Sequence, residues 1–227
     1  HVTLEQGTGA IHTAPGHGYD DYLVGLENDL EIYSPVDALG RFTSEVEHFS
    51  GLQVFEANAR VNQLLGEKGA LLAEAKVAHS YPHCWRCHNP VIFRATSQWF
   101  ISMDHANLRQ EALEEIKQVR WIPSWGEERI SSMIASRPDW CISRQRIWGV
   151  PIIAFYCHQC REPLLCGEVV NHVADIFQRV GPDAWFSLDF SELLPEGVRC
   201  KCGHSEFEKE SDILDVWFDS GVSHQAV

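Results

Sequence analysis

Apolar residues recur at helical spacing in three stretches of the chain, and each stretch predicts an amphipathic helix. Gly69 follows the first stretch and is typical of the residue that ends a helix. Ser124 and Glu127 open the third with the spacing of a capping box. The apolar positions are Val54, Val61, Leu64 and Leu65 within 52–72, Leu108, Ala112, Leu113 and Ile116 within 107–119, and Ile130, Met133 and Ile134 after Ser124.

Four short apolar runs predict β-strands between and around these helices. Strands separated by helices indicate an α/β fold, with a sheet covered on both faces. We find no internal repeat, low-complexity tract or Gly/Ser linker, so we expect the parts of the chain to be joined compactly. The strand candidates are 91–93, 98–101, 150–155 and 213–218.

The composition is that of a globular protein: 227 residues, 44% of them hydrophobic. The formal net charge of -14 gives no global reason to expect nucleic-acid binding, so any RNA contact must rest on local basic residues. No apolar stretch is long enough for a membrane span, and no signal peptide is visible. We therefore expect a cytoplasmic protein without membrane partners, and, since position 1 is His, an internal fragment.

Two close cysteine pairs predict a structural zinc site. Cys157 and Cys160 form a CxxC pair, and Cys200 and Cys202 form a CxC pair further along the chain. Four thiolates can hold a tetrahedral Zn²⁺ with no ligand position left open for chemistry. The alternative is four unpaired surface thiols, but the polar turns and Gly203 beside the pairs favour a zinc ribbon.

A second CxxC pair, Cys84 and Cys87, lies between His83 and His88 and has no further close cysteine pair to complete it. It is either half of a second zinc site whose partners are missing from this chain, or a site completed by histidine. We favour the first reading, because adjacent histidines seldom reach the ion held by a CxxC beside them. Cys141 and Cys166 stand alone and are expected to be small buried residues.

The segment 7–18 is rich in Gly and His and predicts a shaped loop of the kind that often lines a site. Asp20 and Asp21 follow it, and acidic residues ahead of the apolar run 22–26 favour a helix N-terminus. On this evidence alone, Asp21 is a helix cap and His12 is a loop histidine whose hydrogen bonds are satisfied.

The run from Gly7 to Asp21, Gly-Thr-Gly-Ala-Ile-His-Thr-Ala-Pro-Gly-His-Gly-Tyr-Asp-Asp, resembles the editing-domain motif of isoleucyl-tRNA synthetases. The valyl and leucyl relatives share the opening Gly-Thr-Gly but differ after it. Three more stretches agree with the same family: 79–94, 138–151 and 215–221. Their order and spacing match the family over essentially the whole chain.

The resemblance implies part of an inserted editing domain, followed by part of a Rossmann-type class I catalytic domain with a zinc-ribbon insertion. We expect the editing part at 1–80, the return into the catalytic domain at 81–155, the zinc-ribbon insertion at 156–210 and a catalytic strand with its loop at 211–227. The whole enzyme would use ATP and Mg²⁺ to attach isoleucine to its tRNA, and would hydrolyse misattached valine. The family's HIGH and KMSKS signatures, which handle ATP, do not occur in this sequence, so we do not expect the chain to aminoacylate alone.

The resemblance also implies roles for individual residues. Asp21 would hold the α-ammonium of the misattached valine, and His12 would lie at the ribose or ester end, while His17 and Asp20 would only shape the site. Trp217 would form a wall of the isoleucine pocket, although core packing is its plain alternative. Two arginines, Arg144 and Arg146, could bind the acceptor end of the tRNA, because guanidinium groups bind phosphates, or could be purely structural.

Other readings remain open at this stage. A valyl or leucyl enzyme is disfavoured by the sequence of 12–18 and by the Arg-Ile-Trp-Gly run at 146–149. A zinc-ribbon binding module without catalysis would explain the cysteines but not the editing motif. A free-standing trans-editing protein would leave the second half of the chain without a purpose.

Overall fold

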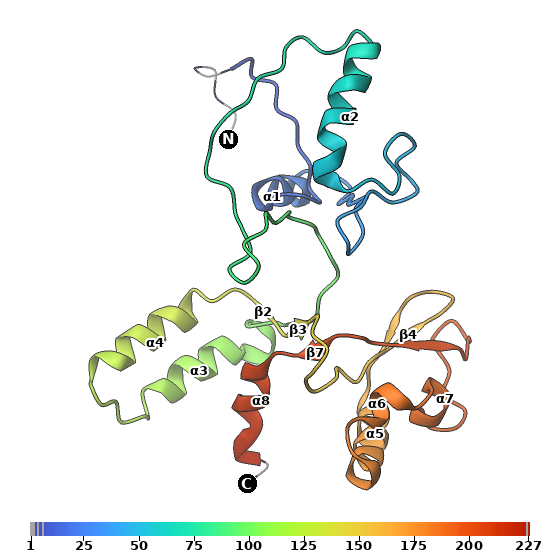
Figure 1. The fold of residues 1–227 in the computed structure, drawn as a ribbon. Coiled ribbons are helices and arrows are strands. Elements are labelled where there is room, and N and C mark those ends of the chain that lie inside the picture. The colour runs from blue at the N-terminus through green and yellow to red at the C-terminus, as the bar shows by residue number, and fades with distance from the viewer. Residues whose placement is uncertain (1–2, 4, 6, 226) are drawn as a thin grey trace. The chain divides into compact units, whose positions relative to one another are not determined.

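The computed structural model describes residues 3, 5, 7–225 and 227, and these fall into two compact units, His1–Ser97 and Gln98–Val227. Figure 1 shows the elements of each unit along the chain. The division between compact units falls later in the sequence than residue 80, where we expect the editing part to end. Compactness does not report functional boundaries, so the predicted division into 1–80, 81–155, 156–210 and 211–227 stays a prediction.

In the part of the first unit that the structure describes, two α-helices are joined by long loops. Helix α1 (Tyr19–Glu27) and helix α2 (Val54–Glu67) confirm two predicted helices. Helix α2 begins where the side chain of Gln53 accepts a hydrogen bond from the Phe55 amide, and it ends just before Gly69, whose φ of 67° only glycine adopts easily. The connecting loops pair through the isolated bridges Val36↔Phe42, Arg41↔Gln53 and His83↔Pro90.

The second unit begins with a short strand and a helical hairpin. The 3₁₀ turn η1 (His105–Asn107) leads into α3 (Leu108–Ile116), which packs against α4 (Trp125–Ala135), as Figure 1 shows. Both helices were predicted, but the predicted capping box is wrong. Ser124 has helical backbone angles and its side chain makes no capping hydrogen bond, because an N-cap residue needs an extended backbone for that contact.

Three small antiparallel sheets connect the rest of this unit. Strand β1 (Phe100–Ile101) pairs with β2 (Trp140–Cys141), and β3 (Ser143–Arg144) pairs with β7 (Ile213–Leu214). The third sheet has the order β5-β4-β6, formed by β5 (Pro163–Leu164), β4 (Phe155–Cys157) and β6 (Phe207–Lys209). Within the described residues, mixed helices and strands are therefore confirmed, but the expected sheet covered on both faces is not found.

Two of the predicted strands are wrong in whole or in large part, and a third, 150–155, is a strand only at Phe155, with an isolated bridge at Pro151. Residues 91–93 form no strand because their backbone is engaged elsewhere: the Val91 amide donates to the Pro82 carbonyl and the Phe93 carbonyl faces His17. The run 213–218 is a strand only at Ile213–Leu214. From Val216 to Val222 it forms helix α8, because the Asp215 side chain accepts a hydrogen bond from the Trp217 amide and starts the helix there.

The main hydrophobic core of the second unit lies between the three-stranded sheet and α5 (Gly167–Val180), α6 (Ala184–Ser187) and α7 (Phe190–Leu193). One face of α5 is buried through Val169, Val173 and Ile176, and the rings of Phe155 and Trp185 meet at 5.0 Å. Helix α7 has the capping box that α4 lacks, formed by Asp189 and Glu192. A final 3₁₀ turn, η2 (Ser223–Gln225), follows α8. Among the helices of the described residues, none combines the length and apolar character that a membrane crossing requires.

Candidate functional site

Four cysteines lie together at the tip of the three-stranded sheet. The sulfurs of Cys157, Cys160, Cys200 and Cys202 all lie within 4.8 Å of one another. The Cys160 and Cys200 sulfurs are 3.4 Å apart, and those of Cys157 and Cys202 are 3.6 Å apart. In a tetrahedral site with metal–sulfur bonds of about 2.3 Å, neighbouring sulfurs are about 3.8 Å apart. The four thiols are therefore already arranged as the corners of a metal site.

The backbone around Cys157 explains how the chain presents these sulfurs. The Cys157 amide donates to the Glu162 carbonyl at 3.1 Å, and the Arg161 amide donates back to the Cys157 carbonyl at 2.9 Å. Arg161 takes a left-handed conformation with φ of 60° to close this turn. Burial alone would raise the pKa of Cys157, but the amides of Cys160 and Gln159 point at its sulfur and lower the pKa to about 6. A lowered pKa favours the thiolate, the form that binds metal. Cys160 shifts the other way: the Glu162 amide lowers its pKa, but the Cys200 side chain and burial raise the pKa to about 12.

The other CxxC pair, in the first unit, has the same backbone geometry. The Cys84 amide donates to the Asn89 carbonyl and the His88 amide donates to the Cys84 carbonyl, both at 2.8 Å. His88 takes the left-handed conformation, with φ of 58°, at the position that Arg161 occupies in the first turn. Amide groups of Cys87 and Arg86 likewise lower the pKa of Cys84.

No third His, Cys, Asp or Glu ligand joins Cys84 and Cys87 in the part of the chain that the structure describes. His83 turns its Nδ1 toward the Tyr81 carbonyl, at 2.8 Å, instead. The pair is thus shaped like half of a metal site, and the described residues offer no other half.

The glycine-rich loop is held against the rest of the first unit at Gly16. The Gly16 carbonyl accepts a hydrogen bond from the Ala95 amide at 2.8 Å, and His17 Nδ1 lies 3.0 Å from the Phe93 carbonyl. A Cβ at position 16 would lie 2.1 Å from the Tyr33 carbonyl oxygen, so only glycine fits there.

Asp21 does not cap helix α1. The N-cap is Gly18, without any side-chain cap, and Asp21 lies in the first turn with Oδ2 accepting a hydrogen bond from the Ala14 amide at 2.9 Å. No protein hydrogen bond to the other oxygen, Oδ1, is found among the described residues. His12 is exposed on the same loop, and the described residues provide no hydrogen bond to its ring, so the structure does not bring His12 and Asp21 into direct contact.

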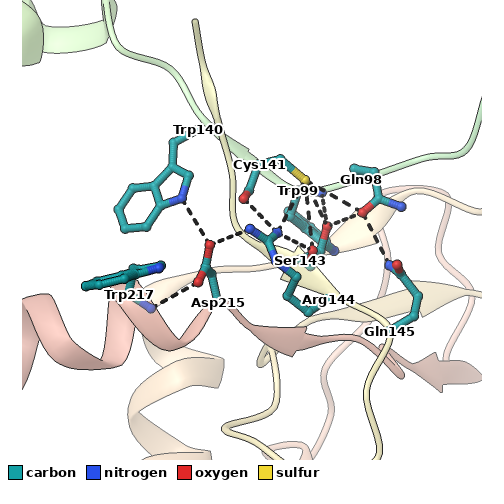
Figure 2. A network of polar contacts seen from close by, with 9 residues as sticks. All are labelled: Gln98, Trp99, Trp140, Cys141, Ser143, Arg144, Gln145, Asp215 and Trp217. Atoms are coloured by element: carbon teal, nitrogen blue, oxygen red, sulfur yellow. Dashed lines mark hydrogen bonds and ion pairs between the residues drawn. The ribbon is translucent and has the colours of Figure 1, made fainter. Parts of the chain in front are cut away.

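Arg144 lies in the second unit at the centre of a polar network (Figure 2). One terminal nitrogen donates to the carbonyls of Cys141 and Ser143, at 2.9 and 2.7 Å, and the other forms an ion pair with Asp215. Arg146 is exposed, and the one contact found for it in the described residues is with the carbonyl of its neighbour Gln145, at 3.1 Å. The two arginines therefore have different surroundings, and Arg146 leaves more of its guanidinium donors available for an external phosphate.

Trp217 lies in the first turn of α8 and is 73% exposed. Among the described residues its indole is therefore not packed into a core, and its role in the isoleucine pocket stays a prediction. The next residue, Phe218, packs instead, with its ring 6.2 Å from that of Trp140.

Glu210 is an anchor that the sequence analysis missed. This buried carboxylate accepts four hydrogen bonds: from Trp99 Nε1 at 2.7 Å, the Tyr156 hydroxyl at 2.9 Å, and the amides of Ser211 and Asp212 at 2.7 and 2.9 Å. Burial opposes its ionisation, but the hydrogen bonds, led by the Asp212 amide, lower its pKa. In turn, burial and the Glu210 carboxylate raise the pKa of Tyr156 to about 12. No local sequence motif identifies such a residue, because its two side-chain donors, Trp99 and Tyr156, lie far away in the sequence.

The chain is similar to known proteins along its whole length. The model of the family described as tRNA synthetases class I (I, L, M and V) matches residues 22–227. The isoleucine–tRNA ligases of Syntrophotalea carbinolica, Geobacter sulfurreducens and Caldanaerobacter subterraneus are 59%, 60% and 55% identical to the chain over its whole length. The chain spans about a quarter of the length of these relatives.

Proposed function

The chain belongs to the class I tRNA synthetases of the isoleucine, leucine, methionine and valine group, and we propose that it is a segment of an isoleucine–tRNA ligase. The observation that carries this proposal is the identity of 55–60% to isoleucine–tRNA ligases along the entire chain. The whole enzyme would activate isoleucine with ATP and Mg²⁺, transfer it to its tRNA, and work in the cytoplasm, where charged tRNA is consumed.

The segment 1–80 is proposed to contribute to hydrolytic editing of valyl-tRNA. An apolar pocket distinguishes isoleucine from valine only weakly, a limit for which the isoleucyl enzyme is itself the standard example. With Oδ2 bound to the Ala14 amide, Asp21 has Oδ1 free to accept hydrogen bonds from the α-ammonium of the misattached valine. The carboxylate would thereby orient the ester for attack by water, with exposed His12 at the ribose end.

The second unit is proposed to contribute to the synthetic site. The exposed indole of Trp217 would form a rigid wall of the isoleucine pocket, because an aromatic face suits a branched aliphatic side chain. Exposed Arg146 would contact a phosphate near the acceptor end of the tRNA. Arg144 has its terminal nitrogens engaged by protein groups, which makes it a poor candidate for that contact.

Zinc is proposed as the structural ion at Cys157, Cys160, Cys200 and Cys202. The donor set is four sulfurs at distances close to tetrahedral edges, which suits Zn²⁺ and leaves no position for a substrate. The ion would tie the turn after β4 to the turn before β6. The shared backbone geometry supports Cys84 and Cys87 as half of a second zinc site, completed by residues outside the described part of the chain.

Amino-acid-dependent exchange of pyrophosphate into ATP by the full-length protein tests the proposed function. We expect exchange with isoleucine, weaker exchange with valine, and charging of isoleucine tRNA but not of leucine or valine tRNA. Charging of leucine or valine tRNA with the matching amino acid instead would refute the assignment while leaving the family intact.

A further inference from the structure

The guanidinium of Arg144 joins strand β3 to the start of helix α8. It lies in β3, opposite Ile213 in β7, so that its side chain reaches the residue that follows β7, Asp215. Figure 2 shows the guanidinium between Asp215 and two backbone carbonyls, those of Cys141 and Ser143. Bidentate binding of a phosphate by both terminal nitrogens would require part of this arrangement to break.

Asp215 is the group that Arg144 neutralises. It is 5% exposed, and a carboxylate buried to that extent needs charge and hydrogen-bond partners. Its Oδ1 accepts from the Trp217 amide at 3.0 Å, while Oδ2 accepts from Arg144 and from Trp140 Nε1 at 3.4 Å. The Asp215 amide donates to the Ile142 carbonyl at 2.7 Å. Both the backbone and the side chain of Asp215 thus fix the point where α8 begins.

The direction of Trp217 follows from that starting point. Its own side chain is 73% exposed and is not held by the core of the unit, whereas its amide is bound by Asp215. Phe218 packs on Trp140 and fixes the rotation of the helix about its axis. Trp217 is therefore oriented through the first turn of α8 rather than through its own packing.

We propose that Arg144 is a positioning residue for amino-acid recognition: by pairing with Asp215 it holds the first turn of α8 and thereby orients Trp217 toward isoleucine. This inference rests on the proposed function, since it takes Trp217 as a wall of the isoleucine pocket. It assigns Arg144 to binding of the amino acid and not to binding of the tRNA.

The test is isoleucine-dependent pyrophosphate exchange by the full-length protein in the absence of tRNA. For Arg144→Met we expect the KM for isoleucine to rise about tenfold, with kcat and the KM for ATP within about twofold, because a misoriented wall weakens binding of the amino acid alone. Arg144→Lys keeps a charge for Asp215 and should recover part of the loss. Asp215→Asn keeps a capping side chain but removes the charge, and should raise the same KM.

Two reference variants make the result specific. Arg129→Met removes an exposed arginine of α4, for which the described residues show no hydrogen bond or ion pair, and should leave all three constants unchanged. Trp217→Ala should raise the KM for isoleucine at least as much as Arg144→Met. If Arg144→Met is insoluble, Arg144→Lys and Asp215→Asn provide the same comparison.

The outcomes separate the inference from the function on which it rests. An unchanged KM for isoleucine in this exchange, together with a raised KM for tRNA in a separate charging assay, would overturn the inference and make Arg144 a phosphate contact. Loss of kcat with an unchanged KM would also overturn it, as a general structural effect. If Trp217→Ala leaves the KM for isoleucine unchanged, the assignment of the pocket wall fails, and absence of isoleucine-dependent exchange in the wild type would refute the proposed function itself.

Discussion

Replacing Glu210 with Gln should destabilise the second unit far more than its small change in shape suggests. The glutamine amide group must face either two backbone amides or the Trp99 indole and the Tyr156 hydroxyl, where the carboxylate accepts hydrogen bonds. At least one donor then loses its acceptor, and a hydrogen bond to a charged group contributes about 1.5–3 kcal/mol. We expect a loss of about 2–3 kcal/mol in the free energy of unfolding at pH 7.

Glu208→Gln is the matched control, since Glu208 lies in the same strand and pairs with Arg161 at the surface, where the two side chains are 53% and 61% exposed. A surface ion pair of this kind contributes about 0–1 kcal/mol, so the control should change stability little. Urea unfolding of the 227-residue chain with bound zinc, followed by tryptophan fluorescence, measures both variants. Equal losses in the two variants would refute the role of Glu210 as an anchor.

The stability difference between the wild type and Glu210→Gln should depend on pH. The folded-state pKa of Glu210 lies below its ordinary value of 4.5. The ionised carboxylate therefore stabilises the folded state above pH 4.5, and this stabilisation is lost as the pH falls through the folded-state pKa. The difference between wild type and Glu210→Gln should be constant near neutrality and shrink below about pH 4.5, because a protonated carboxyl resembles the amide. Loss of zinc at low pH affects both proteins and cancels in the difference. A gap that grows on acidification would contradict the assignment.

Two further changes test the metal site and the loop. Purified under reducing conditions, the chain should retain one zinc ion after dialysis, as measured by metal analysis. Cys160→Ser should abolish zinc retention, and the control Cys166→Ser should not. A folded chain without zinc would refute the site. Gly16→Ala should lower the free energy of unfolding by more than about 2 kcal/mol and expose the loop to protease, because its Cβ would collide with the Tyr33 carbonyl. Gly69→Ala meets open space and should lower it by only about 1 kcal/mol. Equal losses would contradict the packing of the loop.

The sequence predicted those helices and turns that depend on residues close together in the chain. Helix α2 was predicted because its apolar spacing ends at Gly69, and the cysteine pairs were found because a metal-binding turn is built from adjacent residues. Helix α5 was missed, although Val169, Val173 and Ile176 follow the same helical spacing and would have revealed it.

The sequence-based predictions failed where contacts between distant parts of the chain determine the local structure or a residue's surroundings. The run 213–218 is rich in β-branched and aromatic residues and favours a strand, but the buried carboxylate of Asp215 ends the strand and starts α8. Glu210 could not be found from the sequence, because two of its donors, Trp99 and Tyr156, lie 111 and 54 residues away. Arg144 and Arg146 have the same residue type and differ only in which atoms of the folded chain surround them.

We propose that the chain contributes to two separate chemistries, hydrolysis of valyl-tRNA near Asp21 and activation of isoleucine near Trp217. The most direct measurement is deacylation of valine from isoleucine tRNA by the full-length protein, comparing the wild type, Asp21→Ala and, as a control on the neighbouring exposed carboxylate, Asp20→Ala. We predict that Asp21→Ala loses hydrolysis but keeps isoleucine-dependent pyrophosphate exchange, and that Asp20→Ala keeps both. Undiminished hydrolysis by Asp21→Ala would refute the role of Asp21 in editing and leave it only as the acceptor of the Ala14 amide hydrogen bond.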